Sequence, residues 1–171
     1  MLRIVRGATT RVAQDSPARR KTVAMTLSEA WREQAEAWAR WARTPGHDVF
    51  YWRFNLPRFL EIVPEPGRRT IEVGCGEGRM CRELAARGHH VIGIDQSEVL
   101  VRHAADDRST AVVLADGAAL PVRDDAADLV ISFMLLQDVD DLDAVVAELR
   151  AHRDARRPPL PRDRAPARVG R

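Results

Sequence analysis

The sequence predicts an α/β fold: a Rossmann-like, parallel, doubly wound sheet with a helical segment in front of it. Three observations predict this fold. Apolar runs alternate with helical stretches from residue 70 to residue 150, which is the pattern of right-handed crossovers in a parallel sheet. Glycines gather directly after the first of these apolar runs. The chain has 171 residues, 45% of them hydrophobic, which suffices for one domain with tails.

The charge of the chain is divided between an acidic middle and two basic ends. The formal net charge is +2, but residues 1–26 and 151–171 each carry +5 and residues 27–150 carry −8. We expect residues 1–24 to be a disordered leader and residues 151–171 a disordered Arg/Pro-rich tail, because neither has the apolar surface to offset its ordering entropy. The tail has no aromatic residue to stack on bases, so we expect no nucleic-acid partner. No run approaches the roughly 18 apolar residues of a membrane span, which excludes an integral membrane protein.

Residues 25–67 are predicted to form an N-terminal helical lid segment. Thr26-Leu27-Ser28-Glu29 has the form of a capping box, and the helix that it starts is predicted to end at Arg43. Tryptophans recur along this helix at helical spacing, so we expect the aromatic stripe to pack on the body of the domain. The alternative is that the stripe partly covers a ligand. A second short helix is predicted over residues 57–63, after an aromatic cluster.

Residues 68–150 are predicted to form the sheet and its crossover helices. The first crossover helix ends at Gly88, which suits a left-handed C-terminal position, and Ser97 caps the second. The fourth strand is apolar nearly throughout, as in a strand that is covered on both faces. The predicted strands are residues 70–73, 90–94, 111–115 and 127–135, and the predicted helices are residues 79–87, 97–106 and 139–150.

Distinctive residues follow three successive strands. A Gly-x-Gly-x-Gly turn that begins at Gly74 follows the first strand, Asp95 the second and Asp116 the third. Ligands of such sheets bind beyond the carboxyl ends of the strands, so we expect these residues to border one site. The glycines let the backbone approach a ligand closely, and Asp95 can accept hydrogen bonds from both hydroxyls of a ribose. Asp116 can accept from an exocyclic amine such as adenine N6, while the Gly117 amide can donate to a ring nitrogen.

Two cofactors compete for such a site. A nicotinamide dinucleotide brings an anionic pyrophosphate, which favours Gly-x-Gly-x-x-Gly and a helix N-terminus free of acids. Here the spacing is Gly-x-Gly-x-Gly, and Glu72 and Glu77 flank the loop. S-adenosylmethionine carries a sulfonium and an ammonium group instead, which suit these acids better by Coulomb sign. Cys75 and Cys81 match no metal-ligand spacing, so no metal is expected.

Four segments of the chain carry a family resemblance when they are taken together. They are Ile71-Glu72-Val73-Gly74-Cys75-Gly76-Glu77-Gly78, Ile92-Gly93-Ile94-Asp95-Gln96-Ser97, Ala115-Asp116-Gly117-Ala118-Ala119-Leu120-Pro121 and Ala127-Asp128-Leu129-Val130-Ile131-Ser132. In this order and spacing they closely resemble class I S-adenosylmethionine-dependent methyltransferases. Within that class they look like the small-molecule methyltransferase-domain branch, which includes quinone-biosynthesis C-methyltransferases.

The resemblance implies that eight residues bind S-adenosylmethionine: Glu72, Gly74, Gly76, Gly78, Asp95, Gln96, Asp116 and Gly117. The three loop glycines would lie under the methionine part of the cofactor, with Glu72 near its ammonium group. Asp95 would bind the ribose hydroxyls, with Gln96 adjacent, and Asp116 with Gly117 would hold the adenine. Residues 133–137 would face the methyl group and the acceptor.

The resemblance also implies the reaction, in-line transfer of a methyl group to a small-molecule acceptor by a cytoplasmic enzyme. The family's sheet has the strand order 3-2-1-4-5-7-6, and this sequence has counterparts only for 3-2-1-4, because the Arg/Pro-rich stretch follows Arg150. We therefore expect an incomplete sheet of about four strands in a C-terminally truncated chain, with weak or no turnover.

Several points stay open at the level of sequence. The five histidines match no motif position and are expected at the surface, so no catalytic base is assigned. No membrane partner is expected, and the acceptor and the oligomeric state are not specified. The two alternative functions are an NAD(P)-binding oxidoreductase fragment and a non-catalytic interaction protein. The latter would keep a relic methyltransferase fold and use its basic ends to reach an acidic partner.

Overall fold

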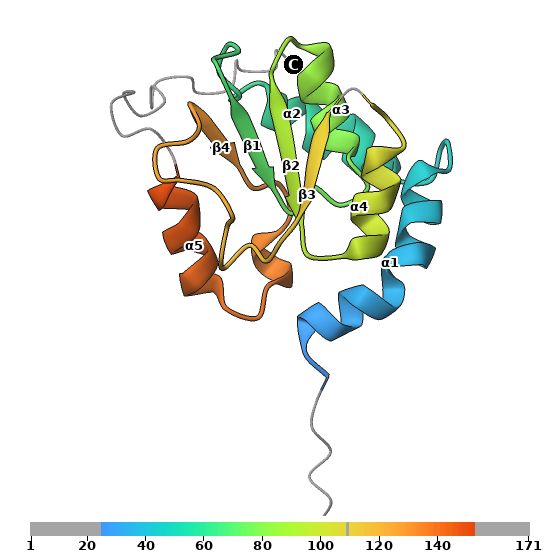
Figure 1. Ribbon diagram of the computed structural model, residues 1–171. Coiled ribbons are helices and arrows are strands. Elements are labelled where there is room, and N and C mark those ends of the chain that lie inside the picture. Colours follow the sequence, from blue (N-terminus) through green and yellow to red (C-terminus); the bar gives the residue numbers. More distant parts are fainter. Residues whose placement is uncertain (1–24, 109, 153–171) are drawn as a thin grey trace, which may run out of the picture.

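A parallel sheet of four strands forms the centre of the protein (Figure 1), described over residues 25–108 and 110–152 by a computed structural model. The strands lie in the order β3-β2-β1-β4, with Thr70 opposite Val91 on one side and Leu129 on the other. The predicted α/β class and the strand order 3-2-1-4 are confirmed. The predicted leader, and the predicted tail from residue 153 on, lie outside the described residues. The strands are β1 (Thr70–Val73), β2 (Val91–Asp95), β3 (Ala111–Leu114) and β4 (Leu129–Ile131).

Helices pack on both faces of this sheet. In Figure 1, α2 and α3 lie behind the sheet and α5 lies in front of it. Behind the sheet, Leu56 and Leu84 pack in one buried cluster with Ile131; in front, Ile71 belongs to a second cluster, against which Leu149 packs. No helix in the described ranges has both the length and the apolar character to cross a bilayer. The helices are α1 (Leu27–Arg43), the π-helix η1 (Tyr51–Asn55), α2 (Leu56–Leu60), α3 (Arg79–Ala86), α4 (Glu98–Ala105), the short 3-10 helix η2 (Leu136–Asp138) and α5 (Leu142–Ala151).

The predicted helix caps form as the sequence indicates. Thr26 Oγ1 accepts from the Glu29 N–H at 3.1 Å, and Glu29 Oε2 accepts from the Thr26 N–H at 2.9 Å, which completes the capping box of α1. Ser97 caps α4 by accepting from the Leu100 N–H. Gly88, two residues after α3, has a φ of 90°, the left-handed conformation expected of it.

The fourth strand is shorter than the sequence predicts. It ends at Ile131 and not at residue 135, because the chain leaves the sheet and reaches Met134, whose φ is 60°. Such a φ is uncommon for a residue with a side chain and is incompatible with a continued strand. The prediction failed because apolar residues continue through this turn, and composition alone does not reveal the turn.

Two helix boundaries also differ from the prediction. The helix predicted over residues 139–150 begins at Leu142, since Asp141 caps it by accepting from the Ala144 N–H. Its other end includes Ala151, and His152 after it is buried, although both residues were assigned to the tail. The short helix predicted over residues 57–63 is α2, which continues the π-helix η1 and ends at Leu60.

Gly93 is the point of closest packing between β2 and the glycine-rich turn. A Cβ at this position would lie 2.8 Å from Cys81 Sγ and 2.9 Å from Cys75 Sγ. Both cysteines are buried, so neither sulfur can move into solvent. The strand therefore requires glycine here for steric reasons.

We predict that Gly93→Ala lowers the free energy of unfolding by about 1–3 kcal/mol, because the added methyl overpacks the two sulfurs. Urea denaturation measures the change. Adding Cys75→Ala removes one of the two sulfurs, so a double-mutant cycle should show favourable coupling between the changes. This account of the packing would be contradicted by an unchanged urea midpoint for Gly93→Ala. It would also be contradicted if the losses of unfolding free energy in the two single variants added up to the loss in the double variant.

Candidate functional site

The turn after β1 is shaped by glycines in left-handed conformations. The N–H groups of Gly74 and Cys75 both donate to the Ile94 carbonyl, which holds the turn against the end of β2. A Cβ at Gly74, where φ is 77°, would lie 2.7 Å from the Leu135 side chain. At Gly76, where φ is 57°, a Cβ would have no atom within 4 Å. Gly74 is thus required by packing, whereas Gly76 leaves open space above the turn.

Asp95, at the end of β2, joins this turn to the next helix. Its Oδ2 accepts from the Gly76 N–H and its Oδ1 accepts from the Ser97 N–H, each at 2.9 Å. Burial raises the pKa of Asp95 above its usual value, and the hydrogen bonds from Ser97 and Gly76 offset part of the rise. Each oxygen of a carboxylate has capacity for a second hydrogen bond, so Asp95 can still accept from a ligand.

A cavity of about 270 Å³ lies above the carboxyl ends of the strands. The structure brings seven of the eight predicted cofactor-binding residues to its wall: Glu72, Gly74, Gly76, Asp95, Gln96, Asp116 and Gly117. Gly78 is not on the wall. It precedes α3 with a φ of 88°, and its α-carbon faces Ala104, so its role is to let α3 pack against α4.

Glu72 is a buried carboxyl group on the wall of this cavity. It is 2% exposed, and its Oε2 accepts from Cys81 Sγ at 2.8 Å. Burial and the Cys81 contact raise the pKa of Glu72 well above its usual value. A hydrogen bond to Cys75 and burial raise the pKa of the Cys81 thiol in turn, so it stays protonated and donates.

Glu77 is the second buried carboxylate beside the cavity, and two arginines pair with it. Its Oε2 accepts from Arg82 at 2.7 Å and from Arg43 Nε at 3.0 Å. The other oxygen, Oε1, is buried and has no hydrogen-bond partner among the described residues. An unsatisfied buried acceptor is costly, which makes this oxygen a candidate for a ligand contact.

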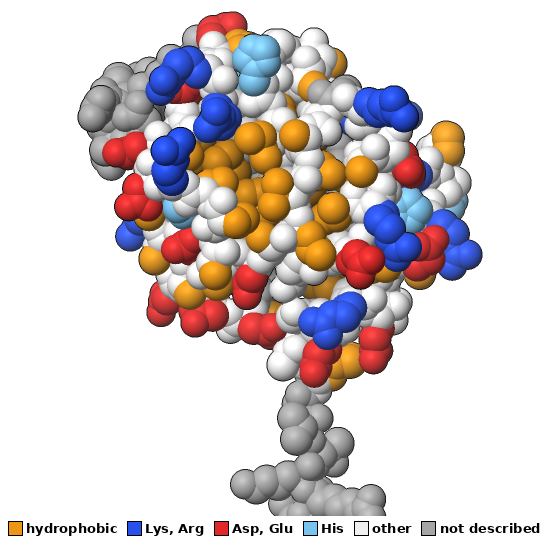
Figure 2. All heavy atoms as spheres, in the orientation of Figure 1, with side chains coloured by type: hydrophobic (Ala, Val, Ile, Leu, Met, Phe, Trp, Pro, Cys, Tyr) orange, Lys and Arg blue, Asp and Glu red, His pale blue; other side chains and the backbone are white. Residues whose placement is uncertain are grey.

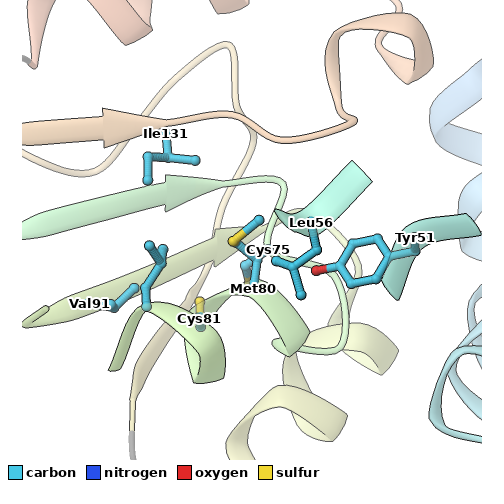
Figure 3. Packing of buried hydrophobic residues seen from close by; sticks show 8 residues of the cluster. Tyr51, Leu56, Cys75, Met80, Cys81, Val91 and Ile131 are labelled. Atoms are coloured by element: carbon cyan, nitrogen blue, oxygen red, sulfur yellow. The ribbon is translucent and has the colours of Figure 1, made fainter. Parts of the chain in front are cut away.

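Tyr51 and Arg79 also line the cavity, although no motif in the sequence marks either residue. The Arg79 guanidinium lies 3.5 Å from the centroid of the Tyr51 ring and donates to Asp48 Oδ2 at 2.8 Å. Figure 3 shows the Tyr51 hydroxyl directed toward the part of the core that contains Met80 and Cys75. Within residues 25–108 and 110–152 this buried hydroxyl has no hydrogen-bond partner, and burial raises the pKa of Tyr51, so the group stays protonated and can donate to a ligand. In the sequence, Tyr51 is only one member of an aromatic cluster. The cluster does not show that the Tyr51 ring is buried while its neighbours are exposed.

Helix α1 packs on the domain and at the same time forms part of the cavity wall. It packs on α4 through Ala35, Ala39 and Leu100, with Trp38 partly buried against them, whereas Trp41 is 41% exposed. Its first turn crosses the cavity, where the Leu27 and Ser28 N–H groups donate to the Asp140 carboxylate at 2.8 and 3.1 Å. Ser28 Oγ also donates to Gln96 Oε1 at 3.0 Å. Trp31 and Trp38 line the cavity, and the alternative that the stripe partly covers a ligand stays a prediction.

The segment after β4 closes the opposite side of the cavity. Phe133, Met134, Leu135 and Gln137 lie on the wall, so most of the predicted acceptor-facing range 133–137 is there. The Phe133 ring packs against Tyr51, with ring centroids 5.8 Å apart. Residues 133–135 thus form an apolar and aromatic part of the wall, and farther along the same segment Asp138, Asp140 and Asp141 also line the cavity.

The expectation that the histidines lie at the surface is wrong for His89 and His152, which are 6% and 4% exposed. Each has a structural partner: His89 Nδ1 contacts Thr70 Oγ1, and His152 contacts Glu148 Oε2 and the Arg123 carbonyl. Neither lines the cavity. The structure thus adds no histidine to the candidate site.

Comparisons with known proteins point to one family. Residues 71–152 match the family model described as a methyltransferase domain. The chain is 38% identical over 95 residues to demethylmenaquinone methyltransferase of Clavibacter sepedonicus, a match that covers 52% of this chain and 38% of the relative. It is 31% identical over 118 residues to malonyl-[acyl-carrier protein] O-methyltransferase of Erwinia pyrifoliae, covering 68% of this chain and 45% of the relative.

A solved structure agrees on the fold. The chain matches a putative S-adenosyl-L-methionine-dependent methyltransferase from Methanococcus maripaludis with a TM-score of 0.56 and 16% sequence identity. That match covers 71% of this chain and 58% of the other. The chain spans less than half the length of each of the curated relatives named above.

We predict that the stability of the protein falls with rising pH because of Glu72. Folding raises the pKa of this carboxyl group above its value in the unfolded chain, 4.5. Its contribution to stability is therefore complete at pH values below 4.5 and is lost as the pH rises toward the pKa in the folded protein. Relative to Glu72→Gln, the wild type should lose up to about 1.4 kcal/mol of unfolding free energy per pH unit above 4.5.

Urea denaturation of both proteins at a series of pH values measures this difference. A matched change at the exposed Glu33, Glu33→Gln, should retain the slope of the wild type. Parallel pH profiles for the wild type and Glu72→Gln would contradict the burial of an uncharged Glu72.

Proposed function

We propose that the chain binds S-adenosylmethionine in this cavity and transfers its methyl group to a small-molecule acceptor, because residues 71–152 match the family model described as a methyltransferase domain. One observation carries the proposal: residues from three successive strand ends border one cavity whose glycine-turn side is acidic. Ligands of doubly wound sheets bind at this edge. The carboxylates of Asp95 and Glu77 on this side favour a cationic ligand over a pyrophosphate.

The residues present fit this cofactor. The open space above Gly76 admits a ligand at the turn, and a Cβ there would occupy it. Because Glu72 Oε2 already accepts from Cys81, we assign the ammonium group of the methionine part to Glu77 Oε1 instead of Glu72, and the Tyr51 hydroxyl would donate to the carboxylate. The Arg79 guanidinium beside Tyr51 would add a positive charge for the same carboxylate.

The nucleoside part would bind along the ends of β2 and β3. We assign the ribose hydroxyls to Asp95 and the adenine amine to Asp116, which is exposed and uses only its Oδ1, on the Ala118 N–H. The Gly117 position accepts no larger residue easily, because a Cβ would approach Val73 at 3.3 Å. Gln96 would be held in place by Ser28 of α1 while the cofactor is bound.

S-adenosylmethionine supplies an electrophilic methyl group when it is bound. The part played by the chain is positioning: α1 and the segment after β4 would restrict water, and the aromatic wall would orient the acceptor. Tyr51 and Phe133 line the cavity side by side, with ring centroids 5.8 Å apart, and Trp31 and Trp38 of α1 also lie on its wall. The acceptors in the names of the relatives differ, so the acceptor is assigned only as a small molecule with an apolar part.

Calorimetric titration with S-adenosylhomocysteine tests the proposal. Asp95→Ala should weaken binding by roughly 30-fold, because two ribose hydrogen bonds to a charged group are lost. Asp116→Ala should weaken it by roughly tenfold. Asp143→Ala, at an exposed acid in the first turn of α5, should bind as the wild type does.

Two results would overturn the proposal. Equal binding heats for the wild type and Asp95→Ala would remove the assigned ribose contact. Enhanced NADH fluorescence on addition of the protein, without affinity for S-adenosylhomocysteine, would favour the oxidoreductase alternative. Circular dichroism of Asp95→Ala shows whether the variant is folded, and Asp116→Ala provides a second readout that does not depend on the anchoring of the turn.

A further inference from the structure

The helical stretch over residues 49–60 exposes apolar side chains on a face that is in contact with solvent, where polar residues are usual. Val49 is 45% exposed, Phe50 65% and Phe54 58%, and the rings of the two phenylalanines stack with centroids 5.2 Å apart. Arg53 lies between them in the sequence. We call Val49, Phe50, Arg53 and Phe54 the aromatic face. Single exposed apolar residues are ordinary, but a contiguous group of them marks an interaction site.

The helical spacing explains why these four residues lie together. Val49 and Arg53 are four residues apart, as are Phe50 and Phe54, so each pair shares a side of the helix. The opposite side carries Tyr51 and Leu56, which are 2% and 5% exposed and belong to the core. The stretch therefore has two apolar sides, one packed in the core and the other exposed to solvent.

Arginines outnumber acids in the segment that carries the aromatic face, although the domain as a whole is acidic. Residues 40–60 contain four arginines and one aspartate, whereas residues 27–150 carry −8. Two of these arginines are paired, Arg43 with Glu77 and Asp106, and Arg58 with Glu61. That aspartate, Asp48, is already paired with Arg79 at 2.8 Å. Within the described part of the chain, no carboxylate pairs with the guanidinium groups of Arg40 or Arg53. These cations are available to an anionic partner.

We propose that the aromatic face docks the protein on the surface of an anionic lipid bilayer. Phenylalanine rings would enter the boundary between headgroups and acyl chains, while Arg53 would contact lipid phosphates. A folded protein partner needs on the order of 1,000 Å² of complementary surface, and this face is a narrow ridge of two helical turns. A fluid bilayer accommodates such a ridge without a matching shape.

The location of the aromatic face relates docking to the cavity. Tyr51, on the same π-helix, lines the cavity, and Asn55 Nδ2 donates to Met134 Sδ, which lies on the cavity wall. A protein docked through this face would hold one side of the cavity close to the bilayer. The sequence-based expectation of no membrane partner rested on the length of apolar runs, which tests only spanning segments. The docking surface arises from residues four positions apart.

Vesicle sedimentation of the full chain tests the proposal. The wild type should bind vesicles of phosphatidylcholine with about one third phosphatidylglycerol, and bind pure phosphatidylcholine more weakly. The Phe50→Ser, Phe54→Ser double variant should bind at least roughly tenfold more weakly, because both rings are lost. Arg53→Glu should lose much of the preference for phosphatidylglycerol. The matched control is the double variant Leu114→Ser, Leu142→Ser at two exposed apolar residues elsewhere, which should bind as the wild type does.

Three outcomes would overturn the proposal. The first is an absence of vesicle binding by the wild type. The second is equal binding by the wild type and the double phenylalanine variant, since the basic ends of the chain would then account for the interaction. The third is self-association of the wild type, abolished in that variant and unaccompanied by vesicle binding, which would make the face an interface between copies. All these readouts are independent of methyltransferase activity, so they stand apart from the test of the cofactor.

Discussion

The carboxylate of Asp95 is the interaction on which the candidate site depends. By accepting from the N–H groups of Gly76 and Ser97, it joins the turn after β1 to the start of α4 across the end of β2. The turn can present its backbone to a ligand only while it is held in this left-handed form. Gln96, next in sequence, contacts α1 through Ser28, so the helix that crosses the cavity depends on the same point of the sheet edge.

The second constraint is the arrangement of charge in a poorly solvated space. Burial and the Cys81 thiol raise the pKa of Glu72 well above its usual value, which favours its uncharged form, whereas Glu77 is stabilised by pairing with Arg43 and Arg82. Tyr51 stays protonated between the acidic turn and the Arg79 guanidinium. The cavity thus offers acceptors on one side and donors next to them, which suits a ligand that carries both an ammonium and a carboxylate group.

Much of the fold followed from the sequence because local signals and the global pattern agree. The capping box at Thr26, the cap at Ser97 and the alternation from β1 to β3 were all predicted with small errors. The end of β4 was not, because apolar residues continue through the turn at Met134. The positions of Tyr51 and Arg79 on the cavity wall were not predicted for a related reason. They depend on how η1 and α3 pack, and no motif spacing encodes that contact. The aromatic face was hidden for the same reason, since exposure is a property of the folded chain.

The most direct measurement is a crystal structure of the full chain with S-adenosylhomocysteine. The account predicts that both ribose hydroxyls lie within hydrogen-bond distance of Asp95, while its oxygens keep their bonds to the Gly76 and Ser97 N–H groups. The adenine should lie beside Asp116, and the methionine part above Gly76. A ligand bound elsewhere, or a cavity without ligand at saturating concentration, would contradict the account.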